Sequence, residues 1–201
     1  MASDLTKRPG APGRGSSRKE TIMAPCNVLD FWFGEIDPKQ WWRADEQLDR
    51  EIGERFGALH HQAARCELYA WRGDLPGRLA EIIVLDQFSR NIHRHSAAAF
   101  ACDAQALALA QEAIRACAVG LLEPARRAFL YMPFMHSESP AIHAIAATLF
   151  AQAGLEGNRQ FASRHQAIVD RFGRYPHRNA ALGRHSSAEE IAFLETPGSS
   201  Y

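Results

Sequence analysis

The sequence lacks the features that mark several common classes of protein. No apolar run approaches the roughly 18–20 residues that a membrane-spanning helix needs. Lys and Arg number 23, as do Asp and Glu, so the chain carries no basic surplus of the kind that a general nucleic-acid binder uses to meet phosphates. We therefore expect neither a membrane segment nor a nucleic-acid partner.

Cysteine is scarce, and the familiar catalytic motifs are missing. Cys26, Cys66, Cys102 and Cys117 stand apart, with no C-x-x-C pair. Scattered cysteines in helical stretches usually fill core space, which is typical of a reducing compartment, so we expect a cytoplasmic protein. There is no G-x-G-x-x-G, phosphate-binding loop, H-E-x-x-H or G-x-S-x-G. The sequence thus predicts no metal site, and its motifs identify neither a cofactor nor a reaction.

Residues 1–22 differ in composition from the rest of the chain. This stretch contains three Gly, two Pro, three Ser and five basic residues, with almost no apolar side chain to bury. Such a composition predicts a disordered basic N-terminal tail. Residues 23–201 are expected to form a single folded domain.

From Asn27 onward the pattern is helical nearly everywhere, and no stretch shows the alternation that predicts a strand. Asp37 and Pro38 look like the cap and first residue of a long helix. Short loops with Gly or Pro join the helices, which favours stacked antiparallel hairpins in an all-α fold. The predicted helices cover residues 27–33, 38–71, 76–93, 103–118, 123–135, 140–153, 158–172 and 187–195.

The predicted helix 76–93 is apolar on nearly every side, yet it carries Asp86 and Arg90 one turn apart on an apolar face. Burying both charges costs several kcal/mol unless they pair with each other or meet other polar groups. Either they form an internal ion pair that holds the hairpins in register, or they line a polar pocket. Gln87 and Asn91, on an adjoining side, would extend such a pocket.

Two further helices place histidines where they could do chemistry. One apolar helix ends in His136-Ser137-Glu138. His136 could transfer protons, bind a metal, or simply be a cation that the helix dipole stabilises at the C-terminal end. In the helix 158–172, His165 shares a face with apolar residues and should point inward. It could serve as a ligand-binding group or as a hydrogen-bonded core residue.

A turn rich in arginine follows that helix. Arg174, His177, Arg178 and Asn179 lie between Gly and Pro residues. Arginine recognises carboxylates and phosphates through two parallel hydrogen bonds, so this turn could bind a small anion. The alternative is a solvated basic loop.

Six segments, in a fixed order from about residue 27 to 195, together carry a family resemblance. They are Val28-Leu29-Asp30-Phe31-Trp32-Phe33-Gly34, Trp41-Trp42, Leu85-Asp86-Gln87-Phe88-Ser89-Arg90-Asn91, Ala99-Phe100-Ala101-Cys102-Asp103, Phe129-Leu130-Tyr131-Met132-Pro133 with His136-Ser137-Glu138, and Arg171-Phe172-Gly173-Arg174-Tyr175-Pro176-His177-Arg178-Asn179. With these segments the sequence resembles domain-of-unknown-function family 924, and the resemblance implies an all-helical fold similar to tetratricopeptide repeats, with no established reaction. His143 departs from the pattern, because Gln or another polar residue is expected there.

We expect the polar segments to converge in space, because isolated buried polar groups cost more than groups that satisfy one another. Such a pocket would take a small anionic ligand, with or without catalysis. The alternative is a module that binds a peptide or protein in a groove between hairpins, and a third possibility is a purely structural network. The candidate catalytic side chains are His136, His165 and Asp86, and the candidate ligand-binding ones are Arg90, Asn91, Glu138, Arg174, His177, Arg178 and Asn179.

Overall fold

The computed structural model describes residues 23–199, and this part of the chain consists of helices and turns without a strand. The all-α prediction is therefore confirmed, whereas the finer likeness to tetratricopeptide stacking stays an expectation. The tail predicted for residues 1–22 lies outside the described residues. Within residues 23–199, every helix falls short of the length and apolar character that crossing a bilayer requires.

The α-helices vary from one turn to five. They are α1 (Pro25–Asp30), α2 (Glu46–Ala64), α3 (Leu75–Ile83), α4 (Ser89–Ile92), α5 (Asp103–Ala116), α6 (Pro124–His136), α7 (Pro140–Phe150), α8 (Glu156–Phe172) and α9 (Ala188–Leu194). Two wide π-helical turns, η1 (Phe31–Glu35) and η4 (Val84–Phe88), continue α1 and α3. Short 3₁₀ turns make up the rest: η2 (Gln40–Trp42), η3 (Tyr69–Gly73), η5 (Ala97–Phe100), η6 (Val119–Leu121) and η7 (Pro176–Arg178).

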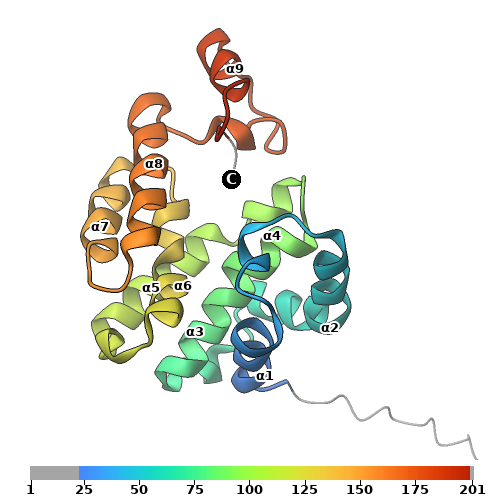
Figure 1. Ribbon diagram of the computed structural model, residues 1–201. Helices are drawn as coiled ribbons and strands as arrows, with labels where there is room; N and C mark the ends of the chain where they lie inside the picture. Colours follow the sequence, from blue (N-terminus) through green and yellow to red (C-terminus); the bar gives the residue numbers. More distant parts are fainter. Residues whose placement is uncertain (1–22, 200–201) are drawn as a thin grey trace, which may run out of the picture.

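The helix α3 contacts α1, α5, α6, η3 and η4. It packs against α1 on one side and α5 on the other, and α2 packs against α4 and η4 (Figure 1). From α5 to α8, each helix packs against the next along the chain, so these four form a row. The last helix, α9, stands apart from this row (Figure 1) and contacts η7.

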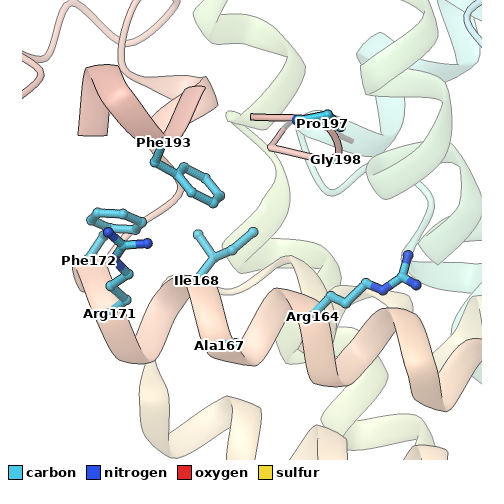
Figure 2. Close-up of a pocket in the computed structure, with 8 residues that line it drawn as sticks. All are labelled: Arg164, Ala167, Ile168, Arg171, Phe172, Phe193, Pro197 and Gly198. Atoms are coloured by element: carbon cyan, nitrogen blue, oxygen red, sulfur yellow. The ribbon is translucent and has the colours of Figure 1, made fainter. Parts of the chain in front are cut away.

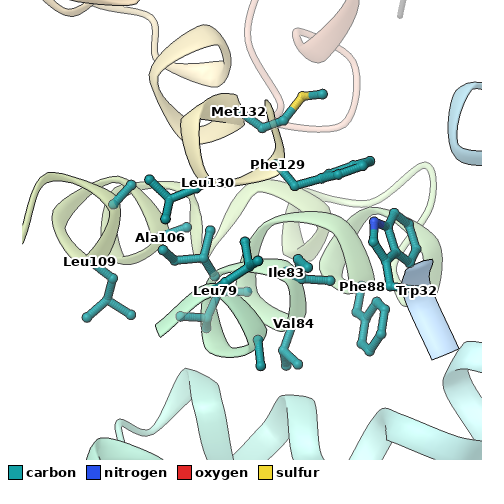
Figure 3. Close-up of a cluster of buried hydrophobic side chains, with 14 of the residues drawn as sticks. Trp32, Leu79, Ile83, Val84, Phe88, Ala106, Leu109, Phe129, Leu130 and Met132 are labelled. Atoms are coloured by element: carbon teal, nitrogen blue, oxygen red, sulfur yellow. The ribbon is translucent and has the colours of Figure 1, made fainter. Parts of the chain in front are cut away.

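Large apolar side chains from several helices meet around α3 (Figure 3). Leu79 and Ile83 of α3 are fully buried. The Trp32 ring lies 5.7 Å from the Phe88 ring and 5.4 Å from the Phe129 ring, centroid to centroid. Aromatic pairs at such distances add to the stability that comes from buried area alone. The apolar pattern of the predicted helix 76–93 corresponds to the burial of residues 79–89, which include Glu81 in an ion pair with Arg72.

The long helix predicted for residues 38–71 is wrong at both ends. It begins after Asp45, whose carboxylate accepts hydrogen bonds from the backbone N–H groups of Gln47 (2.9 Å) and Leu48 (3.2 Å). Asp37 instead closes a local turn upstream of η2, accepting from the backbone of Lys39. The helix ends at Ala64 because the chain then takes a left-handed conformation, with φ of 61° at Cys66. The short 3₁₀ turn η3 follows.

Candidate functional site

Asp86 lies in the π-helical turn η4, which interrupts the otherwise continuous path from α3 to α4. Such wide turns inside helices are rare, and they occur frequently at functional sites. The Asp86 side chain is only 1% exposed, and the side-chain N–H of Gln87 donates to it over 2.6 Å. An ionised carboxylate has thus been placed in the apolar interior, where it must be compensated.

Two side chains from different helices contact the Asp86 carboxylate and offset the cost of burying its charge. Arg90 donates from Nη1 to the Asp86 backbone carbonyl (2.6 Å) and to its Oδ1 (3.2 Å). His136, at the C-terminal end of α6, approaches the same Oδ1 through Nδ1 at 2.7 Å. The predicted pairing of Asp86 with Arg90 is confirmed. The Arg90 side chain keeps 21% of its surface exposed, so the pair lies at the edge of the interior.

The environment fixes the protonation of both groups. Burial raises the pKa of Asp86, but the positive charge of Arg90 and the hydrogen bonds outweigh it, so the pKa of Asp86 lies well below its ordinary value. Burial and then the Arg90 charge lower the pKa of His136, and the attraction of Asp86 only partly opposes them. At neutral pH the carboxylate is therefore ionised and the imidazole neutral. An ionised carboxylate can only accept a hydrogen bond, so the proton of the neutral His136 ring is assigned to Nδ1, facing Asp86, and Nε2 carries a lone pair.

Two arginines share a second carboxylate, Asp103, at the start of α5. Arg90 donates to its Oδ2 from Nη2 (3.1 Å), and Arg178 from Nη1 (3.0 Å). Arg178 also donates from Nη2 to the His136 backbone carbonyl (3.0 Å). The turn η7 is thereby tied to α4, α5 and α6. Asp86, Arg90, Asp103, His136 and Arg178 are called the central cluster below.

Some buried polar nitrogens near the central cluster lack a partner. Within residues 23–199, no hydrogen bond reaches Nε of Arg178 or Nδ1 of His177, although both atoms are buried. Burial, followed by the Arg178 charge, lowers the pKa of His177 to about 4, so this ring is neutral. An unsatisfied buried polar group costs about 1–3 kcal/mol and calls for a physical explanation.

Glu138 and Asn179 hold the arginine-rich turn against the end of α6. Arg184 donates to both oxygens of Glu138 (2.6 and 2.9 Å) and, from Nε, to Oδ1 of Asn179 (3.0 Å). The backbone N–H of Tyr175 donates to Glu138 as well (2.9 Å). Burial raises the pKa of Glu138, but the hydrogen bonds from Arg184 outweigh it, so the pKa lies below its ordinary value.

His165 points inward, as the helical pattern predicted. Its Nδ1 donates to the backbone carbonyl of Phe161 (2.8 Å), and its ring lies 5.6 Å from that of Tyr175. Burial lowers the pKa of His165 to about 3. The Tyr175 ring stacks under the Arg178 guanidinium at 4.6 Å, and its hydroxyl lies 3.1 Å from Nε2 of His143. His165 therefore reaches the central cluster through Tyr175.

Comparison with known proteins shows the family to which the chain belongs. The family described as bacterial protein of unknown function, DUF924, matches residues 28–198. The chain belongs to this family. A solved structure, of a protein of unknown function from Agrobacterium tumefaciens, is similar over 85% of this chain and 96% of that one, with 37% identity and a TM-score of 0.81. No curated protein matches the chain significantly.

Six of the ten predicted site residues of this DUF924 member lie outside the central cluster. His165, Glu138, His177 and Asn179 have been described above, and the other two, Asn91 and Arg174, pair with carboxylates outside the cluster. Asn91 donates to Asp49 of α2 over 2.8 Å. Arg174 donates to both carboxylate oxygens of Glu190 (2.7 and 2.9 Å), which ties the arginine-rich turn to α9. Asp103, in contrast, belongs to the cluster but was not among the predicted site residues.

Asp103 stands in one of the segments that carry the family resemblance, which was a usable signal. An acidic residue in the first turn of a helix is, however, favoured by the helix dipole in any protein, and this hides a further role. In the part of the chain that the structure describes, no three His, Cys, Asp or Glu side chains gather in a way that could hold a metal ion.

Proposed function

We propose that the central cluster binds a small anionic molecule and that His136 exchanges a proton with it. The observation that carries this proposal is the 2.7 Å contact between Nδ1 of His136 and the buried, ionised Asp86. A carboxylate on one ring nitrogen fixes the tautomer and the ring orientation, and it stabilises the imidazolium that forms when the other nitrogen accepts a proton. Nε2 is then the proton acceptor, and the His136 side chain is 14% exposed.

The charges of the central cluster favour the binding of an anion only when His136 takes up a proton at the same time. Asp86 and Asp103 balance Arg90 and Arg178, so the formal charge is zero while His136 is neutral. The positive charge of Arg90 lowers the pKa of His136. A bound anion would offset this charge and so would raise the pKa of His136 again. Proton uptake and anion binding should therefore strengthen each other.

The unpartnered nitrogens indicate where an anion could be held. Nε of Arg178 always carries a proton, and Nδ1 of His177 carries one in one of the two neutral tautomers; both atoms are buried on the turn η7. A carboxylate or sulfate oxygen would satisfy these N–H groups with charge-assisted hydrogen bonds. Small adjustments of η7 would be needed to admit it, which is common where a ligand binds a turn.

The burial of these groups also weighs against the alternative of a peptide-binding module. A peptide groove presents polar side chains along an open surface, whereas Asp86 and Arg178 are almost completely buried and pair with groups from other helices. A small molecule suits such an enclosed cluster better than an extended chain does.

Calorimetric titration of the full chain with sulfate and with succinate tests the proposal. Between about pH 8 and about pH 6, sulfate keeps its charge, so any tightening of its affinity reports proton uptake by the protein. We expect affinity to rise as pH falls, by about tenfold for each unit by which the anion raises the His136 pKa. His136→Gln should abolish this pH dependence.

His61→Gln is the matched control, because His61 is an exposed histidine of α2. It should leave both the affinity and its pH dependence unchanged. If neither anion binds, or if His136→Gln keeps the pH dependence of the parent chain, the proposed function is wrong. Native mass spectrometry of freshly purified protein would show whether an anion is already retained.

A further inference from the structure

A second site lies between α8 and the segment that follows α9. The cavity there has a volume of about 500 Å³ and shares no residue with the central cluster. Figure 2 shows Ile168 in the middle, with Phe193 and Pro197 facing it from the other side. Its lining residues are Arg164, Ala167, Ile168, Arg171, Phe172, Phe193, Pro197 and Gly198.

The two arginines at the ends of this cavity differ in what they contact. Arg171 stacks its guanidinium over the Phe172 ring at 4.7 Å and the Phe193 ring at 5.9 Å. It also bonds Glu189 of α9, through Nε at 2.9 Å and Nη2 at 2.8 Å. Its charge is thus already paired with Glu189, and the pair links α8 to α9.

Arg164 lies at the opposite end of the row, as Figure 2 shows. Its guanidinium is 5.7 Å from the centroid of the Phe161 ring, and within residues 23–199 no carboxylate forms an ion pair with it. An arginine over an aromatic face keeps its hydrogen-bonding edge available for a carboxylate. Arg164 is therefore the cation that this cavity offers to a ligand.

We propose that this cavity binds an amphipathic carboxylate, such as a medium-chain fatty carboxylate. The carboxylate pairs with Arg164, and the hydrocarbon lies against Ile168, Phe172 and Phe193. The volume falls within the range of about 300–1,000 Å³ that is typical of small-molecule sites. An exposed arginine alone binds anions weakly, because water screens its charge, so contact with the apolar wall must add to the affinity.

Calorimetric titration of the full chain with decanoate and with decanol separates these two contributions. Decanoate should bind the parent chain more tightly than decanol, since only decanoate can pair with Arg164. Arg164→Gln should weaken decanoate binding about tenfold and leave decanol binding unchanged. Arg159→Gln, at an exposed position on the same helix but outside the cavity, should affect neither ligand.

A blocking variant tests the apolar wall. Ala167 is exposed on the cavity wall, so Ala167→Glu should fold normally yet bring a negative charge and extra volume into the cavity. Both ligands should then bind at least tenfold more weakly. The proposal is overturned if decanoate fails to bind the parent chain, if Arg164→Gln weakens both ligands equally, or if Ala167→Glu has no effect. Because decanoate would also act as an anion, His136→Gln must leave its affinity unchanged, and this separates the two sites.

Discussion

Replacing Asp86 with alanine should leave two basic side chains in the interior without their shared carboxylate partner. Arg90 would lose one of its two carboxylate partners, and Nδ1 of His136 would lose its acceptor. Removing one member of a buried ion pair costs about 3–5 kcal/mol. Arg90 keeps Asp103, so the expected loss in the free energy of unfolding lies at the lower end, about 3 kcal/mol. For a chain of this size that corresponds to a fall in Tm of about 6–12 °C.

Urea unfolding followed by circular dichroism measures this loss, and differential scanning calorimetry measures the fall in Tm. Asp86→Asn keeps the shape of the side chain and one acceptor, so it should cost less, about 1–2 kcal/mol. Asp30→Ala, at an exposed position in α1, should change stability by less than about 0.5 kcal/mol. A parent-like stability for Asp86→Ala, or a larger loss for Asn than for Ala, would refute the account of the buried pair.

Two further predictions concern the backbone and the buried histidines. A Cβ at Gly77 would lie 1.9 Å from the Trp71 carbonyl oxygen, so Gly77→Ala should lower the free energy of unfolding by about 1–3 kcal/mol, measured by urea unfolding. A Cβ at Gly157 meets no atom within 4 Å, so Gly157→Ala should raise the free energy of unfolding by up to about 1 kcal/mol. Equal effects of the two substitutions would contradict the packing around η3. Burial lowers the pKa of His60 and His177 from 6.5 to about 4. The unfolded chain then takes up protons first, so their contribution to stability is complete above pH 6.5 and is lost as pH falls toward 4. His177→Gln should flatten this pH dependence, and a slope equal to that of the parent chain would show that folding does not lower the pKa of His177.

Much of the fold was predictable because helical periodicity is a local property. The apolar residues of the predicted helix 76–93 recur on nearly every side, and this pattern indicated a buried helix. The convergence of Asp86, His136 and Arg178 was also predictable, from the energetic cost of leaving buried polar groups isolated. The sequence could not say which partner each group would find.

Long-range geometry decided the features that sequence reasoning missed. Asp49 is 42 residues from Asn91, and only the packing of α2 against α4 brings the two together. The π-helical turn that carries Asp86 leaves no composition signal, since it arises when packing favours an extra residue within one turn. Pro38 made Asp37 look like the start of α2, whereas the cap is Asp45, whose carboxylate accepts from the backbone N–H groups of Gln47 and Leu48.

The most direct test of the account is the protonation state of His136, measured by ¹⁵N NMR of the full chain with labelled histidine. We predict a neutral ring at pH 7, protonated on Nδ1, with a pKa below the ordinary value of 6.5 and a resonance that changes in Asp86→Asn. A ring protonated on Nε2 alone, or an imidazolium that persists at pH 7, would contradict it.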